Sequence, residues 1–363
     1  MESGDEDEDT AWFRPVWQTD EDTEPPGRPL PRRQAVVEPD YTHPLLTPLA
    51  RAQDAVARLE ASAAAAAPAI AEGLRARLSY REAAGWLAYA HVWIHPRDLA
   101  LRDASVTGSY GAAAHAGCLE TQLPATTAHG THFEEAPSDR AVERALRLAH
   151  LWRHLAERRT WSPLETPDSL DETMQYLHMA SARGAAEEWL ASLPAIGQGP
   201  ALIRAGRAAR DWMNRPATTK PLTADGIFLA ACLWRQGRDS GAIPLPFWLA
   251  SEQRLNRLAL QTGLAWMAAF LECVADAARA SLADLGRLQL ASEKGKLLAR
   301  TARSKLPAAF DCALRSPVLT ARSLADRLKI TPQAALGLLR QLAAHGVVRE
   351  ATARASWRVY VLS

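Results

Sequence analysis

The chain has 363 residues, 48% of which are hydrophobic, and its formal net charge is +1. This length and apolar content predict a buried core and roughly two or three domains, which excludes a small scaffold held together by disulfides. The near-zero net charge excludes a uniformly basic protein, so any attraction to nucleic acid must come from local segregation of charge.

The first segment, residues 1–40, is acidic and rich in proline. It opens with the acidic run Asp5–Asp9 and has too little apolar surface to offset the entropy lost on ordering. We therefore predict a disordered acidic tail. Trp12, Phe13 and Trp17 interrupt it, which leaves two alternatives open: a short docking motif for a protein partner, or apolar residues without function in a solvated tail.

Residues 41–290 are predicted to form an all-α core. Segments rich in Ala, Leu, Arg and Glu carry apolar residues at three- and four-residue spacing, and alternating strand patterns are absent. Asp139 and Ser169 are the expected N-caps of two helices, and 107–130 and 193–199 are expected to be irregular. The predicted helices are 46–66, 79–94, 139–158, 170–177, 182–192, 202–214, 224–235, 246–249 and 255–290, the last of which can break at Gly263.

The cysteines and the sequence ends limit the class of protein further. Cys118, Cys232, Cys273 and Cys312 are far apart and form no C-x-x-C pair, which argues against a zinc ribbon and against a disulfide framework. We expect buried thiols. The sequence opens with an acidic run instead of a basic region followed by an apolar one, and no apolar stretch is long enough to span a membrane. We therefore expect a soluble, cytoplasmic protein.

The segment 307–363 carries the clearest pattern of helix boundaries. Thr320 can cap a short helix that runs to about Leu328, and Thr331 can cap a second helix in which Pro332 takes the first position. Gly346 supplies a left-handed stop for this second helix. The spacing predicts two short helices joined by a tight turn.

The apolar residues of these two helices fall on facing stripes that can pack together and against a preceding helix over 307–314. Val347–Val348 and 357–361 then predict a β-hairpin with its tip at 351–355. This order of elements predicts a winged helix-turn-helix. The stripes are Leu324, Ala325 and Leu328 on the first helix and Ala335, Leu338, Leu339 and Leu342 on the second.

The face of the second helix that remains free is predicted to bind double-stranded DNA. Basic residues outnumber acidic ones in 307–363, which supports phosphate contact, although winged helices also serve as protein-interaction modules. We expect a homodimer, because two half-sites multiply the modest affinity of one short helix. The predicted DNA-binding residues are Thr331, Gln333, Ala334, Gly337, Arg340, Gln341 and Arg354.

A basic stretch, Lys294–Lys305, joins the predicted core to the winged helix-turn-helix and is predicted as a linker helix over 291–306. Such a stretch can follow a phosphate backbone. It can equally be a solvated connector, and the sequence leaves both alternatives open.

Two resemblances bear on the core. Leu245–Ser251 and Trp266–Ala275, leading into the winged helix, resemble the C-terminal half of bacterial Fic-domain proteins, in which a helical adenylyltransferase core precedes a winged helix. A closer similarity, which covers most of the chain and includes Ile94–Ala104, is to a bacterial family of unknown function that carries a C-terminal helix-turn-helix domain. These resemblances imply a mainly α fold, a Fic-like core followed by the winged helix-turn-helix.

The residues depart from Fic chemistry. Fic catalysis requires an H-P-F-x-x-G-N-x-x-G-R loop, and here Lys220 stands about where the catalytic base belongs. A protonated lysine cannot act as that base unless it is strongly desolvated. The inhibitory S-x-x-x-E-G motif is absent around 88–94 as well. We therefore expect a transcriptional regulator whose core dimerises or binds a signal, with an AMP transferase with an altered loop as the alternative.

Metal and cofactor chemistry is not expected. His150 and His154 lie one helical turn apart but lack the acidic residue of an H-E-x-x-H site. No phosphate-binding glycine loop occurs, and no nucleophile elbow occurs. A less favoured alternative is a metal site in the irregular segment that contains His115, Cys118, His129 and His132.

Overall fold

The structure is a computed structural model. The predicted acidic tail and the predicted loop 107–130 lie outside the residues that it describes. These described residues are 43–89, 94–104, 139–157, 162–177, 183–196, 199–215, 223–236, 243–244, 246–247, 262–296, 305–352 and 358–363.

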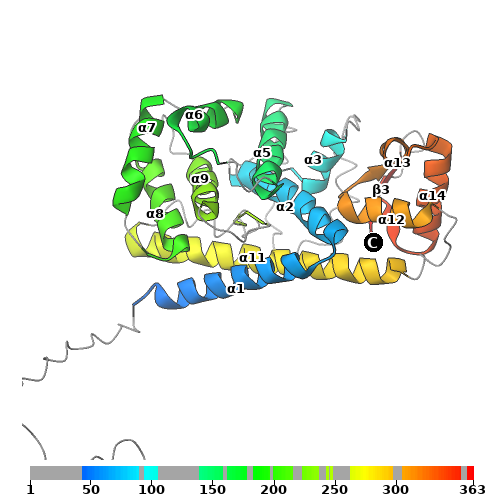
Figure 1. The fold of residues 1–363 in the computed structure, drawn as a ribbon, viewed down its shortest axis with the longest axis horizontal. Coiled ribbons are helices and arrows are strands. Elements are labelled where there is room, and N and C mark those ends of the chain that lie inside the picture. The colour runs from blue at the N-terminus through cyan, green and yellow to red at the C-terminus, as the bar shows by residue number, and fades with distance from the viewer. Residues whose placement is uncertain are drawn as a thin grey trace, which may run out of the picture. The chain divides into compact units, whose positions relative to one another are not determined.

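The described part of the core is mainly helical (Figure 1). Its helices are α1 (Leu46–Ala65), α2 (Pro68–Tyr89), α3 (Pro96–Asp103), α5 (Asp139–Glu157), α6 (Pro167–Tyr176), α7 (Arg183–Ser192), the 3₁₀ turn η2 (Leu193–Ile196), α8 (Ala201–Met213), α9 (Thr223–Arg235) and α11 (Gly263–Lys296).

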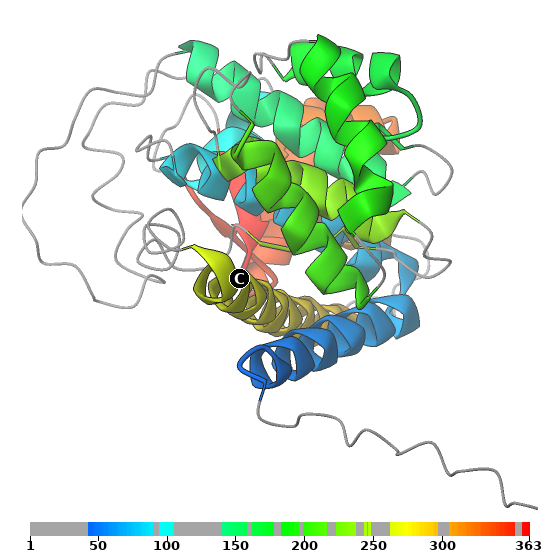
Figure 2. The same ribbon diagram turned by 90° about the vertical axis from the view of Figure 1, so that its left-hand side faces the viewer.

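Helices α1 and α11 lie side by side along one edge of this core (Figures 1 and 2). On α1 the buried residues Ala52, Val56, Leu59 and Ala63 recur every three or four positions, so they form one apolar stripe. This stripe packs against α11, whose buried residues extend over most of its length. Burial of both stripes away from water is what holds the pair together.

Aromatic side chains fill the centre of the core. Trp189 and Trp212 are buried with their rings edge to face, at a centroid distance of 5.5 Å. Phe270 stacks between Trp266, at 5.4 Å, and Phe247, at 5.3 Å. Such pairs add to the large apolar area that each ring buries.

Three helix starts differ from those predicted. Helix α2 begins at Pro68, well before the predicted residue 79, because α1 ends in an extended Ala66 and Pro68 opens the next helix. Helix α3 was not predicted; its His95 side chain accepts a hydrogen bond from Arg97 N–H at 3.0 Å. In α6 the N-cap is Thr166 and not Ser169, whose backbone N–H donates to Thr166 Oγ1 at 3.1 Å.

Other boundaries shift as well. Asp139 is the first residue of α5 and so does not cap it from outside. Pro246 and Phe247, the described part of the predicted helix 246–249, are not helical, and Phe247 N–H instead donates to the buried carboxylate of Glu82 at 3.2 Å. Helix α11 begins at Gly263 and continues past Leu290 to Lys296.

The C-terminal module combines three helices and a small sheet. The strands are in the order β1–β3–β2 with antiparallel neighbours, and Leu319 pairs with Tyr360 while Arg349 pairs with Val361. The predicted hairpin is therefore present as β2 and β3, and the two-residue β1 is an addition. The elements are α12 (Leu306–Arg315), β1 (Leu319–Thr320), α13 (Ala321–Leu328), α14 (Pro332–Ala344), β2 (Val348–Glu350) and β3 (Val359–Leu362).

The apolar centre of this module includes residues from the core helices. Ala69 of α2 and Ala291 of α11 belong to the same buried cluster as Leu324, Leu339 and Tyr360. The module is thus packed onto the helical core and shares part of its own core with it. Within the described residues, each helix is too short or too polar to cross a bilayer.

Candidate nucleic-acid interface

Side-chain caps fix the starts of α13 and α14. Thr320 Oγ1 accepts from Ser323 N–H at 3.0 Å, and Ser323 Oγ accepts from Thr320 N–H at 2.9 Å, which completes a capping box. Thr331 Oγ1 accepts from Ala334 N–H at 3.2 Å, with Pro332 in the first helical position. Both predicted caps are confirmed, and the left-handed Lys329 (φ 51°) that closes α13 was not foreseen.

Helix α14 ends as the sequence predicts. Gly346 is left-handed at φ 66°, its N–H donates to Ala343 O at 2.9 Å, and Val347 N–H donates to Leu342 O at 3.0 Å. This pair of bonds is a Schellman motif, which satisfies the last carbonyl groups of the helix. The chain then turns directly into β2.

One face of α14 is buried and the opposite face is free. Ala335, Leu339 and Leu342 are fully buried, and of the predicted apolar stripe only Leu338 is partly exposed. The residues on the other face share a surface because they are three or four positions apart. We call this surface the exposed stripe: Gln333, Ala334, Gly337, Arg340 and Gln341, all exposed except the partly exposed Gly337.

Of the other two predicted contact residues, Thr331 is exposed at the N-terminal end of the exposed stripe. Arg354 lies outside the described residues, as does most of the predicted hairpin tip. The structure therefore brings six of the seven residues together on one helix.

The positive charge of the module divides into two groups. Arg315 pairs with Asp311 and with Glu72 of α2, Arg327 donates to Ser316 Oγ, and Arg358 lies 3.6 Å from Glu350. These three cations hold the module together or hold it to the core. The exposed cations of the module whose side chains form neither an ion pair nor a hydrogen bond with any described residue are Arg322, Lys329, Arg340 and Arg349.

Sequence reasoning missed the joint between the module and the core. Arg77 of α2 donates to Leu314 O at 2.8 Å, to Ser316 O at 3.1 Å and to Ala313 O at 3.4 Å, and so caps the C-terminal end of α12. Burial lowers the pKa of Arg77 to about 10, so the guanidinium stays protonated at neutral pH. The carbonyl groups at a helix C-terminus carry partial negative charge that a buried cation offsets.

The core supplies a second polar cluster but no metal centre among the residues that the structure describes. His150 Nε2 lies 2.7 Å from Asp103 Oδ1, and Tyr80 donates to the same carboxylate. Burial alone would raise the pKa of Asp103, but these hydrogen bonds outweigh it and lower the pKa. His154 is partly buried. Lys220, His115, Cys118, His129 and His132 lie outside the described residues.

The comparison with known families falls on the module that carries the exposed stripe. Residues 306–362 match the model of a family described as an HTH DNA binding domain. The chain ends in a helix-turn-helix DNA-binding domain. This HTH domain spans α12 to β3, and α14 is the second of the two helices that the tight turn joins. No curated protein matches the chain.

Proposed function

We propose that this protein is a transcriptional regulator that binds duplex DNA through α14 of its HTH domain. The proposal rests on the exposed stripe. Helix α14 is capped and packed on one face, and its other face presents Gln333, Arg340 and Gln341 to solvent. The same domain carries the unpaired cations Arg322, Lys329 and Arg349. Such a helix enters the major groove and reads base edges there.

Each residue of the exposed stripe has a role that its chemistry suggests. Gln333 and Gln341 can donate to and accept from adenine, and Arg340 can bind guanine or a phosphate. Ala334 and Gly337 are small, which lets the helix backbone approach the duplex closely. Thr331 sits at the first turn, where free backbone N–H groups favour a phosphate.

The strands support a winged form of the domain. The antiparallel pair β2 and β3 emerges directly after α14, and the segment that joins them carries Arg354. We propose that this segment is the wing and that Arg354 contacts the sugar–phosphate backbone beside the groove that α14 occupies.

The helical core is proposed to dimerise the protein or to bind a signal. Its large buried interior supports a stable scaffold, and a dimer would place two recognition helices on paired half-sites. Fic-like ancestry of this core rests on the sequence resemblance alone. Incubation with labelled ATP and magnesium tests it for residual chemistry, because transfer of label to protein would contradict a role limited to regulation.

The decisive experiment is retention of random-sequence duplex DNA by the full chain over a range of salt concentrations. Arg340→Ala should weaken retention at 0.1 M salt by about ten-fold and flatten the salt dependence, because a phosphate or base contact is lost. Arg204→Ala removes an exposed cation from α8 and is the matched control.

The outcomes separate the candidate functions. Retention that falls steeply with salt in the wild type and in Arg204→Ala, but is weaker in Arg340→Ala, supports DNA binding by α14. A wild-type protein that shows no salt-sensitive retention contradicts the proposal and favours an HTH domain that binds protein.

A further inference from the structure

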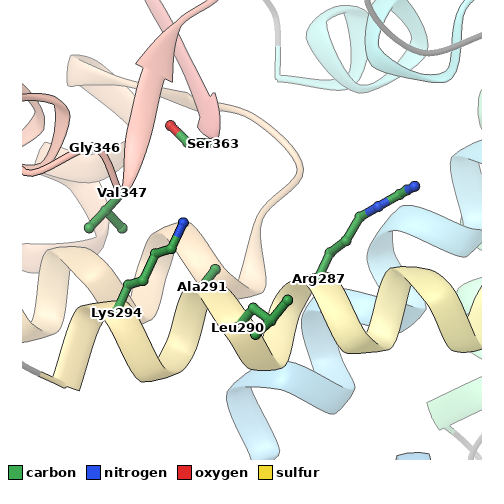
Figure 3. A pocket seen from close by; sticks show the side chains of 7 residues that line it. All are labelled: Arg287, Leu290, Ala291, Lys294, Gly346, Val347 and Ser363. Carbon is green, nitrogen blue, oxygen red and sulfur yellow. The ribbon is translucent and has the colours of Figure 1, made fainter.

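The end of α11 lies against the turn that follows the recognition helix. Together they enclose a hollow of about 120 Å³ that opens to solvent (Figure 3). In Figure 3, Lys294 rises from α11 toward the side on which Val347 and Ser363 lie. The residues that line the hollow are Arg287, Leu290, Ala291 and Lys294 of α11 and Gly346, Val347 and Ser363 of the HTH domain.

Lys294 differs from the other cations on the last turns of α11. Arg287 pairs with Asp284 at 2.9 Å, and Lys296 pairs with Glu293 at 2.5 Å. Lys294 is exposed and forms no ion pair with any described residue. An unpaired ammonium group at the mouth of a hollow is available to an external anion.

The position of Lys294 relative to α14 is fixed by packing on either side of it. The adjacent Gly295 is buried against Phe310 of α12, and a Cβ added there would lie 2.1 Å from the ring. One turn earlier, Ala291 is part of the buried cluster of the HTH domain. The backbone from which Lys294 projects is therefore held in register with the HTH domain.

Lys294 also lies near the turn that follows the C-terminal end of α14. Gly346, which lines the hollow, directly follows the last turn of α14. A helix of 13 residues is about 20 Å long, which exceeds the width of about 12 Å of the major groove. If α14 crosses the groove, at least one of its ends therefore comes close to the phosphates that border it.

We propose that Lys294 binds a backbone phosphate of the same duplex that α14 occupies, so that the DNA interface extends beyond the HTH domain onto the core. This inference rests on the proposed function. It also assigns a role to the first residue of the basic stretch, for which the sequence left two alternatives open.

The test compares two lysines on the same helix end in the full chain. Lys294→Ala should make the negative slope of log affinity against log salt shallower by about 0.9. It should also weaken binding to random duplex DNA about eight-fold at 0.1 M salt. Lys296→Ala removes the same charge two positions away, where the side chain points to a different side of α11 and pairs with Glu293. It should leave the slope close to that of the wild type.

Lys294→Arg keeps the charge and should restore most of the slope. Both lysines are exposed, so folding should be unaffected, and circular dichroism and thermal melting will check this. If the wild type and Arg340→Ala behave as proposed but Lys294→Ala and Lys296→Ala have equal slopes, this inference is wrong and the proposed function stands. If the wild type shows no salt-sensitive binding, the proposed function itself fails.

Discussion

Gly73 lies where α2 passes close to the backbone of the HTH domain. A Cβ added at this position would lie 2.0 Å from Leu314 O, a backbone atom that cannot move aside without shifting α12. Gly73→Ala should therefore lower the free energy of unfolding by about 2 kcal/mol, although alanine is the better helix former. Chemical denaturation of the full chain measures this change.

Gly286 provides the control for Gly73. It also lies within a long core helix, but a Cβ added there would meet no atom within 4 Å. Gly286→Ala should raise the free energy of unfolding by about 0.5–1 kcal/mol through helix propensity alone. If Gly73→Ala raises the free energy of unfolding as Gly286→Ala does, the contact with Leu314 does not require glycine.

At the scale of single elements, local signals were reliable where a cap and an apolar stripe coincide. The starts of α13 and α14 were predicted because Thr320 and Thr331 each precede a clear stripe. The start of α6 was missed because Ser169 and Thr166 are both good caps, and Pro167 decides between them. The strand β1 has two residues, too few to show an alternating pattern, and it exists only through pairing with β3.

Helix α14 carries a glycine in its interior that packing does not require. A Cβ added to Gly337 would meet no atom within 4 Å, so Gly337→Ala should stabilise the HTH domain by about 0.5–1 kcal/mol. If the exposed stripe lies against DNA, the added methyl group should at the same time weaken retention of duplex DNA. Thermal melting and filter binding of one variant measure both effects.

Gly286→Ala adds a methyl group to α11 away from the exposed stripe and is the reference for this pair of measurements as well. It should stabilise the protein without any effect on DNA retention. Equal retention by both variants would mean that the backbone of α14 does not approach the duplex at Gly337.

For the whole molecule, the sequence located the exposed stripe but not the joint that supports it. The stripe depends on residues within a few positions of one another, whereas Arg77 and Leu314 are 237 positions apart. The same limit applies to the charge count, because the surplus of basic residues over 307–363 includes Arg315, which pairs with Glu72 and Asp311. Long-range partners cannot be assigned from a single sequence.

The joint predicts that the core and the HTH domain unfold together. Arg77→Met keeps much of the side-chain volume but leaves the carbonyl groups of Ala313, Leu314 and Ser316 without this donor. Loss of this buried charged donor should lower the free energy that opens the HTH domain away from the core by about 3 kcal/mol. Amide hydrogen exchange should then become roughly 100-fold faster in α12–α14 while the pairing of α1 with α11 stays protected.

Arg58→Met provides the control, since Arg58 lies on the solvent side of α1 and pairs only locally with Asp54. It should leave exchange in both parts unchanged. If exchange in Arg77→Met rises equally in the core and in the HTH domain, the guanidinium is not what couples the two. The shared apolar cluster at Ala69 and Ala291 then couples the core to the HTH domain. A selective increase would identify Arg77 as the residue that couples the stability of the HTH domain to that of the core.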